Sequence, residues 1–133
     1  MTRFLIDTNA LLRYLLKDIP AQSEIVAKIF HQAKKSEVQI TIPLIVFFEA
    51  TYMLTRFYKI SRSDVQEQCE RLLMVMYLDI PDRQVLLLGY QTWVENRSIS
   101  FADAVLMHMA TLADQELLTF DKKLAKLAKT SKI

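Results

Sequence analysis

Four acidic residues of the chain stand in short contexts whose residue types could support metal-assisted chemistry. They are Asp7, Glu49, Asp103 and Asp121. Apolar residues flank each of them, so we expect their charges to lie near buried surface, where an unpaired charge is costly. If the fold gathers them in one pocket, the carboxylates would repel one another, and a hard divalent cation with oxygen ligands would relieve that repulsion. The pattern therefore indicates a divalent-metal site.

Helix capping explains three of these acids equally well when each is taken alone. Asp7 follows an apolar run and precedes a helix, Asp103 stands three residues after Ser100, and Asp121 precedes a lysine-rich helix. A side-chain cap contributes about 0.5–2 kcal/mol, enough to explain an acid without a catalytic role. Both interpretations stay open for single residues, and the combination of all four favours a shared site.

Glu49 has no capping alternative, because apolar residues stand three and four positions to either side of it. Its structural alternative is an ion pair with Arg56, seven residues further on. Polar neighbours of the four acids could orient ligands or hold water, and they are Thr8, Asn9, Ser100 and Thr119. His108 lies among apolar residues, and we expect it to be packed rather than to act as a base.

The elements that must position these residues alternate between short strands and helices. Short apolar or β-branched runs predict strands at 4–6, 38–42, 77–80 and 117–119. Helical spacing and capping signals predict helices at 10–17, 21–35, 44–58, 61–76, 81–96 and 100–113, with a last one from 121. The helix at 44–58 is apolar around much of its circumference, which predicts extensive burial.

Helical crossovers between strands imply a parallel sheet covered by helices on both faces. Ligands of such sheets lie beyond the carboxyl ends of the strands. Asp7 and Asp121 follow the first and last of the four strands, so one edge of the sheet could host all four acids. The single glycine of the chain excludes a glycine-rich phosphate loop.

Length and composition predict one folded domain, residues 1–133, with 52% hydrophobic and 24% charged residues. The single cysteine, Cys69, excludes an internal disulfide, and two separated histidines do not form a histidine-built metal site. The sequence shows neither a signal peptide nor a membrane span, so we expect a cytoplasmic protein. Five lysines follow residue 121, which is more typical of a solvated helix face than of a site for a polyanion.

In four segments the chain resembles the PIN domain family, and within it the small VapC-type toxins of prokaryotic toxin–antitoxin pairs. The segments are Phe4-Leu5-Ile6-Asp7-Thr8-Asn9, Phe48-Glu49, Ser100-Phe101-Ala102-Asp103-Ala104 and Leu118-Thr119-Phe120-Asp121-Lys122-Lys123-Leu124. Their order and separations agree with the family over essentially the whole chain. The family usually continues into a final strand, whereas this chain ends at Ser131-Lys132-Ile133.

The resemblance implies a three-layer α/β/α sandwich around a parallel sheet of four or five strands. It also implies a homodimer, an endoribonuclease activity that depends on Mg²⁺ or Mn²⁺, and inhibition by a small antitoxin protein. By position, Asp7, Glu49, Asp103 and Asp121 become the catalytic and metal-binding quartet. Asp7 and Asp103 are expected to be the primary metal ligands.

Four oxygen ligands of this kind suit phosphodiester hydrolysis, in which a bound cation activates water and screens the phosphate. Cleavage would leave a 5′-phosphate and a 3′-hydroxyl. The basic residues expected near the substrate RNA are Arg13, Lys17, Lys122 and Lys123. Two other classes compete: a PIN-fold binding module without catalysis, and an aspartyl phosphotransferase. The second would need an Asp at position 9, where the chain has Asn9.

Overall fold

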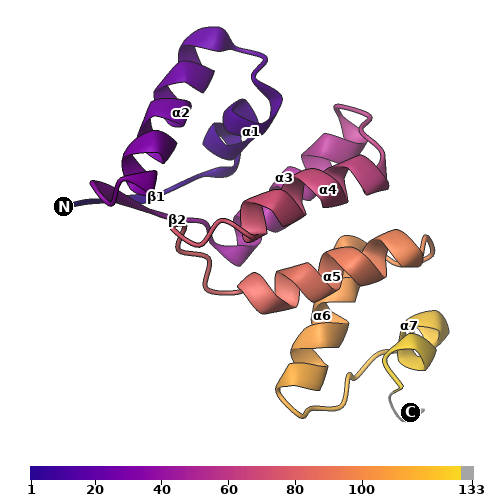
Figure 1. Ribbon diagram of the computed structural model, residues 1–133. Coiled ribbons are helices and arrows are strands. Elements are labelled where there is room, and N and C mark those ends of the chain that lie inside the picture. The colour runs from indigo at the N-terminus through magenta and orange to yellow at the C-terminus, as the bar shows by residue number, and fades with distance from the viewer. Residues whose placement is uncertain (130–133) are drawn as a thin grey trace. The chain divides into compact units, whose positions relative to one another are not determined.

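A computed structural model describes residues 1–129 as seven helices and two strands (Figure 1). The strands are β1 (Thr2–Leu5) and β2 (Val38–Thr41). The helices are α1 (Thr8–Leu16), α2 (Pro20–Lys34), α3 (Leu44–Arg56), α4 (Arg62–Leu73), α5 (Arg83–Glu95), α6 (Phe101–Leu112) and α7 (Lys122–Leu127). The chain divides into two compact units, unit 1 (Met1–Asp82) and unit 2 (Arg83–Ile133), and each is described by itself.

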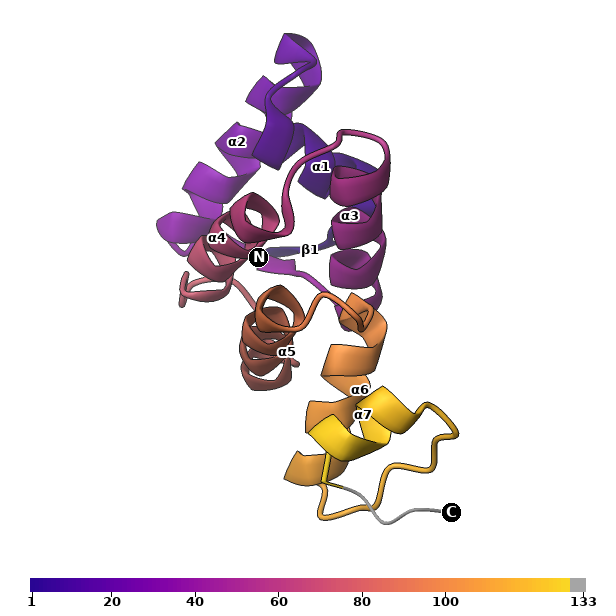
Figure 2. The ribbon, with the colours of Figure 1, turned by 90° about the vertical axis from the view of Figure 1, so that its right-hand side faces the viewer.

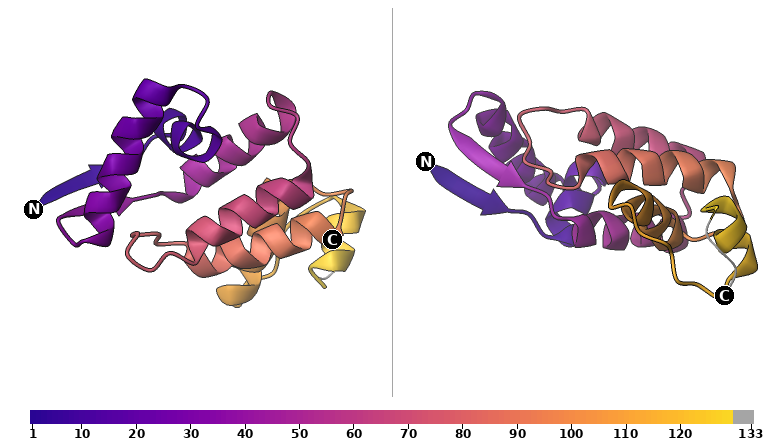
Figure 3. Two further views of the ribbon diagram at one scale, coloured as in Figure 1. Left: turned by 45° about the horizontal axis from the view of Figure 1, so that its top comes forward. Right: turned by 90° about the horizontal axis from the view of Figure 1, so that it is seen from below.

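The sheet of unit 1 is parallel. β1 and β2 lie side by side with Leu5 opposite Thr41 (Figure 3, right). The predicted strand at 77–80 is reduced to a single parallel bridge between Thr41 and Asp79. Two hydrogen bonds hold this bridge: Asp79 N donates to Ile40 O at 2.9 Å, and Ile42 N donates to Asp79 O at 2.9 Å. The segment therefore pairs where the sequence predicts it, over a shorter length.

The α/β class and the parallel pairing are confirmed. Of the four or five strands expected, the structure assigns two and one bridge within residues 1–129. No strand is assigned at 117–119 in the part of the chain that the structure describes. A strand exists only through a paired neighbour, so local apolar character alone does not create one. The segment 131–133, on which the expectation about a final strand rests, lies outside the described residues.

The predicted helices are all present, with ends that differ by up to three residues. Helix α3 is extensively buried, as predicted, and keeps one exposed face. Phe47 and Leu54 are fully buried, whereas Ile45 and Tyr52 are 63% and 57% exposed. Nine of its thirteen residues are buried or half-buried and the exposed ones are Ile45, Glu49, Tyr52 and Arg56, so the predicted extensive burial is confirmed and exposure is confined to one narrow face.

In unit 1, α1 packs against both α2 and α3, α2 packs against β2, and α3 packs against α4 (Figure 2). Tyr14 of α1 stacks on Phe30 of α2 with ring centroids 3.8 Å apart and planes 13° apart. Burial of apolar side chains of this size contributes about 1.5–3 kcal/mol each. These contacts hold the start of α1 in place relative to α3, and both helices carry residues of the predicted site.

In unit 2, α5 and α6 pack closely side by side (Figure 2). A Cβ at Gly89 would lie 2.6 Å from Cγ2 of Val105, so only glycine allows this approach of the two helices. Phe101 stacks on Tyr90 at 4.2 Å and meets the edge of Trp93 at 5.6 Å. An aromatic cluster therefore anchors the first residue of α6. Each helix within residues 1–129 is too short or too polar to cross a membrane.

Candidate functional site

Asp7 is the N-cap of α1, as the capping interpretation predicts. Its Oδ1 accepts a hydrogen bond from Ala10 N at 2.8 Å. The second carboxylate oxygen has no partner within the described residues. The cap uses one oxygen and fixes the direction of the carboxylate, so the other oxygen stays free for a ligand.

Glu49 meets the start of α1 across the fold of unit 1. Thr8 Oγ1 donates a hydrogen bond to Glu49 Oε1 at 3.2 Å, between residues 41 positions apart in the chain. Because Thr8 directly follows Asp7, this bond brings the first two predicted site segments together. The alternative ion pair with Arg56 is absent among the described residues, and Arg56 lies 5.8 Å from the ring centroid of Tyr52 instead.

Asp103 and Asp121 stand at the starts of α6 and α7 in unit 2. Ser100 Oγ accepts from Asp103 N at 3.1 Å, which confirms Ser100 as the cap, and the carboxylate of Asp103 has no partner within residues 1–129. Asp121 is itself a cap: its Oδ1 accepts from Lys123 N at 3.0 Å and from Leu124 N at 3.1 Å. Thr119 Oγ1 accepts from Asp121 N at 3.1 Å and so fixes the backbone before the helix.

The carboxylates of this quartet are more exposed than the sequence suggests. Asp7, Glu49 and Asp121 are exposed, and Asp103 is half-buried. The expectation that buried surface makes the charges costly is therefore wrong for the three exposed acids, whose carboxylates are open to water. Three of the four acids lie at helix N-termini, where the helix dipole favours a negative charge. Each carboxylate keeps at least one oxygen without a partner among the described residues.

The two units each contribute two carboxylates. Asp7 and Glu49 belong to unit 1, and Asp103 and Asp121 belong to unit 2. Within residues 1–129, no group of three or more His, Cys, Asp or Glu side chains forms a candidate metal cluster. The donor chemistry of the quartet nevertheless fits a hard cation, since carboxylate oxygens and bound waters are the ligands that Mg²⁺ and Mn²⁺ prefer.

Arg13 does not occupy an exposed rim, contrary to expectation. It is 7% exposed, its Nε lies 3.4 Å from Asp18 Oδ1, and its Nη2 donates to the hydroxyl of Tyr58 at 3.0 Å. The guanidinium therefore ties α1 to the segment after α3. Lys122 and Lys123 are exposed and directly follow Asp121, a position that suits contact with a polyanion.

Two further polar residues have structural roles. Asp79 is not among the site residues predicted from the sequence. Its Oδ2 accepts a hydrogen bond from Thr41 Oγ1 at 2.7 Å, beside the bridge that extends the sheet. The weak strand signal at 77–80 was the only hint of it. Nε2 of His108 lies 2.7 Å from Thr92 Oγ1, and burial lowers the pKa of His108. This agrees with a packed histidine that joins α6 to α5.

Comparison with known protein families identifies the family to which this chain belongs. The sequence matches the family described as PIN domain over residues 4–130, a range that spans both units. No curated protein matches the chain. PIN domains have an α/β fold, are typically nucleases and generally use divalent metal ions. The match covers nearly the whole sequence, so this chain belongs to the PIN domain family and carries a nuclease fold.

Proposed function

We propose that the protein is an endoribonuclease that depends on Mg²⁺ or Mn²⁺ and acts as the toxin of a type II toxin–antitoxin pair. One observation carries the proposal: the Thr8–Glu49 hydrogen bond joins the first two acidic segments, although they lie 41 residues apart. A capping role for Asp7 does not require that contact. Family membership supplies the reaction class, and the acids of the chain supply the donors for a hard cation.

We assign different roles to the four acids according to their surroundings. Asp7 and Asp103 are proposed as the primary metal ligands, with Glu49 and Asp121 adding charge or orienting water. Because one oxygen of Asp7 and one of Asp121 are held by helix N–H groups, their free oxygens have a fixed direction before any ligand binds. A bound divalent cation would supply Lewis acidity and charge screening for hydrolysis.

The polar neighbours hold these carboxylates rather than bind the metal. Thr8 orients Glu49 through its hydroxyl, and Ser100 and Thr119 fix the backbone at Asp103 and Asp121. Asn9 is exposed in the first turn of α1, where its amide can bind water or phosphate. Removal of polar residues that orient metal-binding side chains typically changes metal affinity or activity by about 10–100-fold.

The proposed partners follow from the charges around the site. The substrate is RNA, contacted by Lys122 and Lys123 beside Asp121 and preferentially unpaired, since splayed bases are the readable form. We further propose a small antitoxin that brings a basic side chain to the acids, a homodimeric state and action in the cytoplasm. The lysines offset repulsion between the phosphate backbone and the acidic site.

Replacement of Asp7 tests the chemistry with little effect on the fold. Asparagine caps helices about as well as aspartate, so Asp7→Asn removes the charge and keeps the cap. We expect RNA cleavage in Mn²⁺ to fall by at least about 100-fold, with an unchanged melting temperature. The wild-type products should carry 5′-phosphate and 3′-hydroxyl ends. The matched control is Glu37→Gln, an exposed acid of unit 1 outside the quartet, which should cleave like the wild type.

Calorimetric titration with Mn²⁺ provides a readout that does not depend on the identity of the RNA. The wild type should bind Mn²⁺, and both Asp7→Asn and Asp103→Asn should weaken binding by at least about tenfold. A shared loss in both variants would indicate that residues of the two units serve one site. Full cleavage by folded Asp7→Asn, or a wild type that binds no Mn²⁺, would contradict the proposal and favour a binding module.

A further inference from the structure

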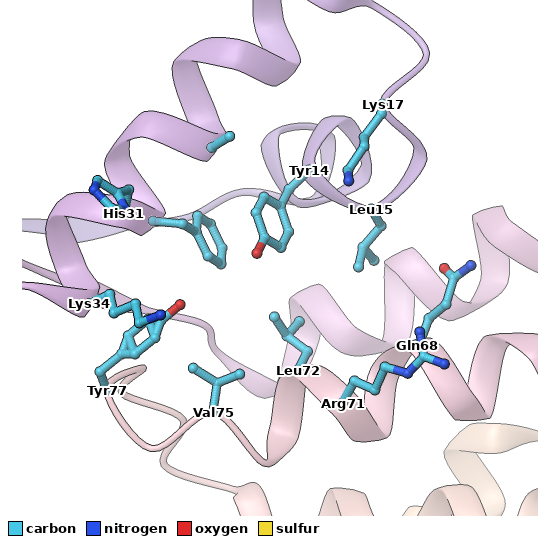
Figure 4. Close-up of a pocket in the computed structure, with 12 residues that line it drawn as sticks. Tyr14, Leu15, Lys17, His31, Lys34, Gln68, Arg71, Leu72, Val75 and Tyr77 are labelled. Atoms are coloured by element: carbon cyan, nitrogen blue, oxygen red, sulfur yellow. The ribbon is translucent and has the colours of Figure 1, made fainter.

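Unit 1 contains a cavity of about 560 Å³ between α1, α2 and α4, and no residue of the acidic quartet lines it (Figure 4). Cations and aromatic phenols share its wall, and none of its lining residues is acidic. The polar and charged residues that line it are Tyr14, Lys17, His31, Lys34, Gln68, Arg71 and Tyr77. A volume of this size falls within the range of small-molecule sites, about 300–1,000 Å³.

The cations of this wall are available to an anion. Lys17 and Lys34 are exposed and form no ion pair within residues 1–129. Arg71 pairs with Glu67 one helical turn earlier, and such exposed pairs contribute only about 0.3–0.5 kcal/mol. Lys17 also lines a smaller neighbouring cavity with Glu24. The net charge of the lining residues is therefore positive, and acids lie beside it at Glu67, which pairs with Arg71, and at Glu24 beyond Lys17.

The aromatic residues offer flat surfaces and neutral donors. Tyr14 points into the cavity from α1, with Lys34 and Tyr77 to one side and Gln68 and Arg71 to the other (Figure 4). One face of its ring is covered by Phe30 at 3.8 Å. Burial, and to a lesser extent Tyr77, raise the pKa of Tyr14. Its hydroxyl therefore stays protonated at neutral pH and can donate a hydrogen bond to a phosphate oxygen.

Gln68 adds an unsatisfied acceptor to the same wall. Its Oε1 is buried and has no hydrogen-bond partner among the described residues. A buried polar atom without a partner is destabilising by about 1–3 kcal/mol. This atom is closed to solvent, so it lies behind the surface that a ligand in the cavity would touch.

We propose that this cavity binds a nucleotide, with its phosphate at the cations of the rim and its base against Tyr14 and Tyr77. The nucleotide could be a free 5′-mononucleotide or one unit of a single RNA strand, since both present the same groups. Base–aromatic stacking contributes about 1–3 kcal/mol per base and tolerates different sequences. None of the four acids lines the cavity, so nucleotide binding there does not depend on the proposed nuclease activity.

Titration of the full chain with adenosine 5′-monophosphate tests the proposal, in EDTA so that no metal-dependent cleavage occurs. We expect saturable binding with amide NMR shifts at Tyr14, Leu15 and Tyr77, and at least tenfold weaker binding of adenosine and of inorganic phosphate. The double variant Lys34→Gln/Arg71→Gln should lose at least tenfold in affinity. The control Lys28→Gln changes an exposed lysine of α2 that does not line the cavity, and should bind like the wild type.

Further titrations distinguish a free mononucleotide from an RNA strand as the ligand, and test an acidic peptide as the competing ligand. A single-stranded RNA that binds with the same shifts and is displaced by the mononucleotide identifies a strand as the ligand, and binding of the mononucleotide alone identifies the free form. Unchanged affinity in the folded double variant, or no saturation by either nucleotide form, would overturn the proposal. Binding of an acidic peptide with the same shifts, without binding of nucleotides, would overturn it as well.

Discussion

Helices α4 and α6 begin with the same local motif in the two units of the molecule. Ser61 Oγ accepts from Asp64 N at 3.2 Å at the start of α4, and Ser100 Oγ accepts from Asp103 N at 3.1 Å at the start of α6. Both helices have a serine cap followed three residues later by an aspartate. The backbone at the two starts is therefore stabilised in the same way.

The two helix starts differ in the two residues that stand between the serine cap and the aspartate. In α4 these positions hold Arg62 and Ser63, and Asp64 is exposed. In α6 the first helical residue is Phe101, which is 6% exposed and packs in the aromatic cluster of unit 2. Asp103 is consequently half-buried on a helix anchored by its own first turn. A cap shows where a helix starts, whereas rigid support from the core distinguishes the acid that we assign to the metal site.

The largest expected effect comes from neutralising each acid in turn. Asp103→Asn should reduce RNA cleavage by at least about 100-fold, whereas Asp64→Asn should leave cleavage unchanged. Both variants should alter the free energy of unfolding by less than about 1 kcal/mol, since each loses a first-turn charge. Cleavage rates and denaturant unfolding measure the two effects. Equal loss of cleavage in both variants would remove the functional distinction between the two helix starts.

Substitution of Gly89 tests the packing of α5 against α6. Gly89→Ala places a Cβ where Val105 Cγ2 lies 2.6 Å away, and the β-branched valine cannot swing aside. Helix propensity alone would stabilise the variant by about 1 kcal/mol, but we expect a net destabilisation of about 1–3 kcal/mol from overpacking. Thermal unfolding measures it, with the exposed Gln91→Ala of the same helix as control. A more stable Gly89→Ala protein would show that the two helices can separate freely.

Removing the caps should have nearly equal effects on the two helices. Ser61→Ala and Ser100→Ala should each destabilise the protein by about 1 kcal/mol. Only Ser100→Ala should also reduce RNA cleavage, because it loosens the turn that carries Asp103. Unfolding and cleavage measured on the same samples separate the two effects, and a similar loss of activity in Ser61→Ala would contradict the assignment.

The smallest expected effect is a change of stability with pH, and it concerns His108 of α6. Burial lowers the pKa of His108 below its ordinary value of 6.5, so the unfolded chain binds the proton more readily than the folded one. The contribution of the neutral His108 to stability is therefore complete above pH 6.5 and declines as the pH falls through the lowered pKa. Denaturant unfolding of the wild type and of His108→Gln between pH 8 and pH 5 should show their stability difference shrinking toward acid pH. A difference that grows toward acid pH would contradict this sign.

Local chemistry made much of the helical framework predictable. Asp7, Ser61, Ser100 and Asp121 were all predicted at helix starts, and each is an N-cap in the structure. A capping hydrogen bond spans two or three residues, so it can be inferred from neighbouring letters of the sequence. The strands were less predictable, because the lengths at 77–80 and 117–119 depend on partners that are distant in the chain.

By itself, the sequence determined the α/β class, the helix starts and the identity of the four acids, since these depend on residue types and short spacings. Only the tertiary structure decided which side chains meet. It brought Thr8 to Glu49, buried Arg13 against Asp18, and left three of the four carboxylates exposed. The physical reason is that these contacts join residues from different elements, and their formation depends on how helices pack around the core rather than on any local preference.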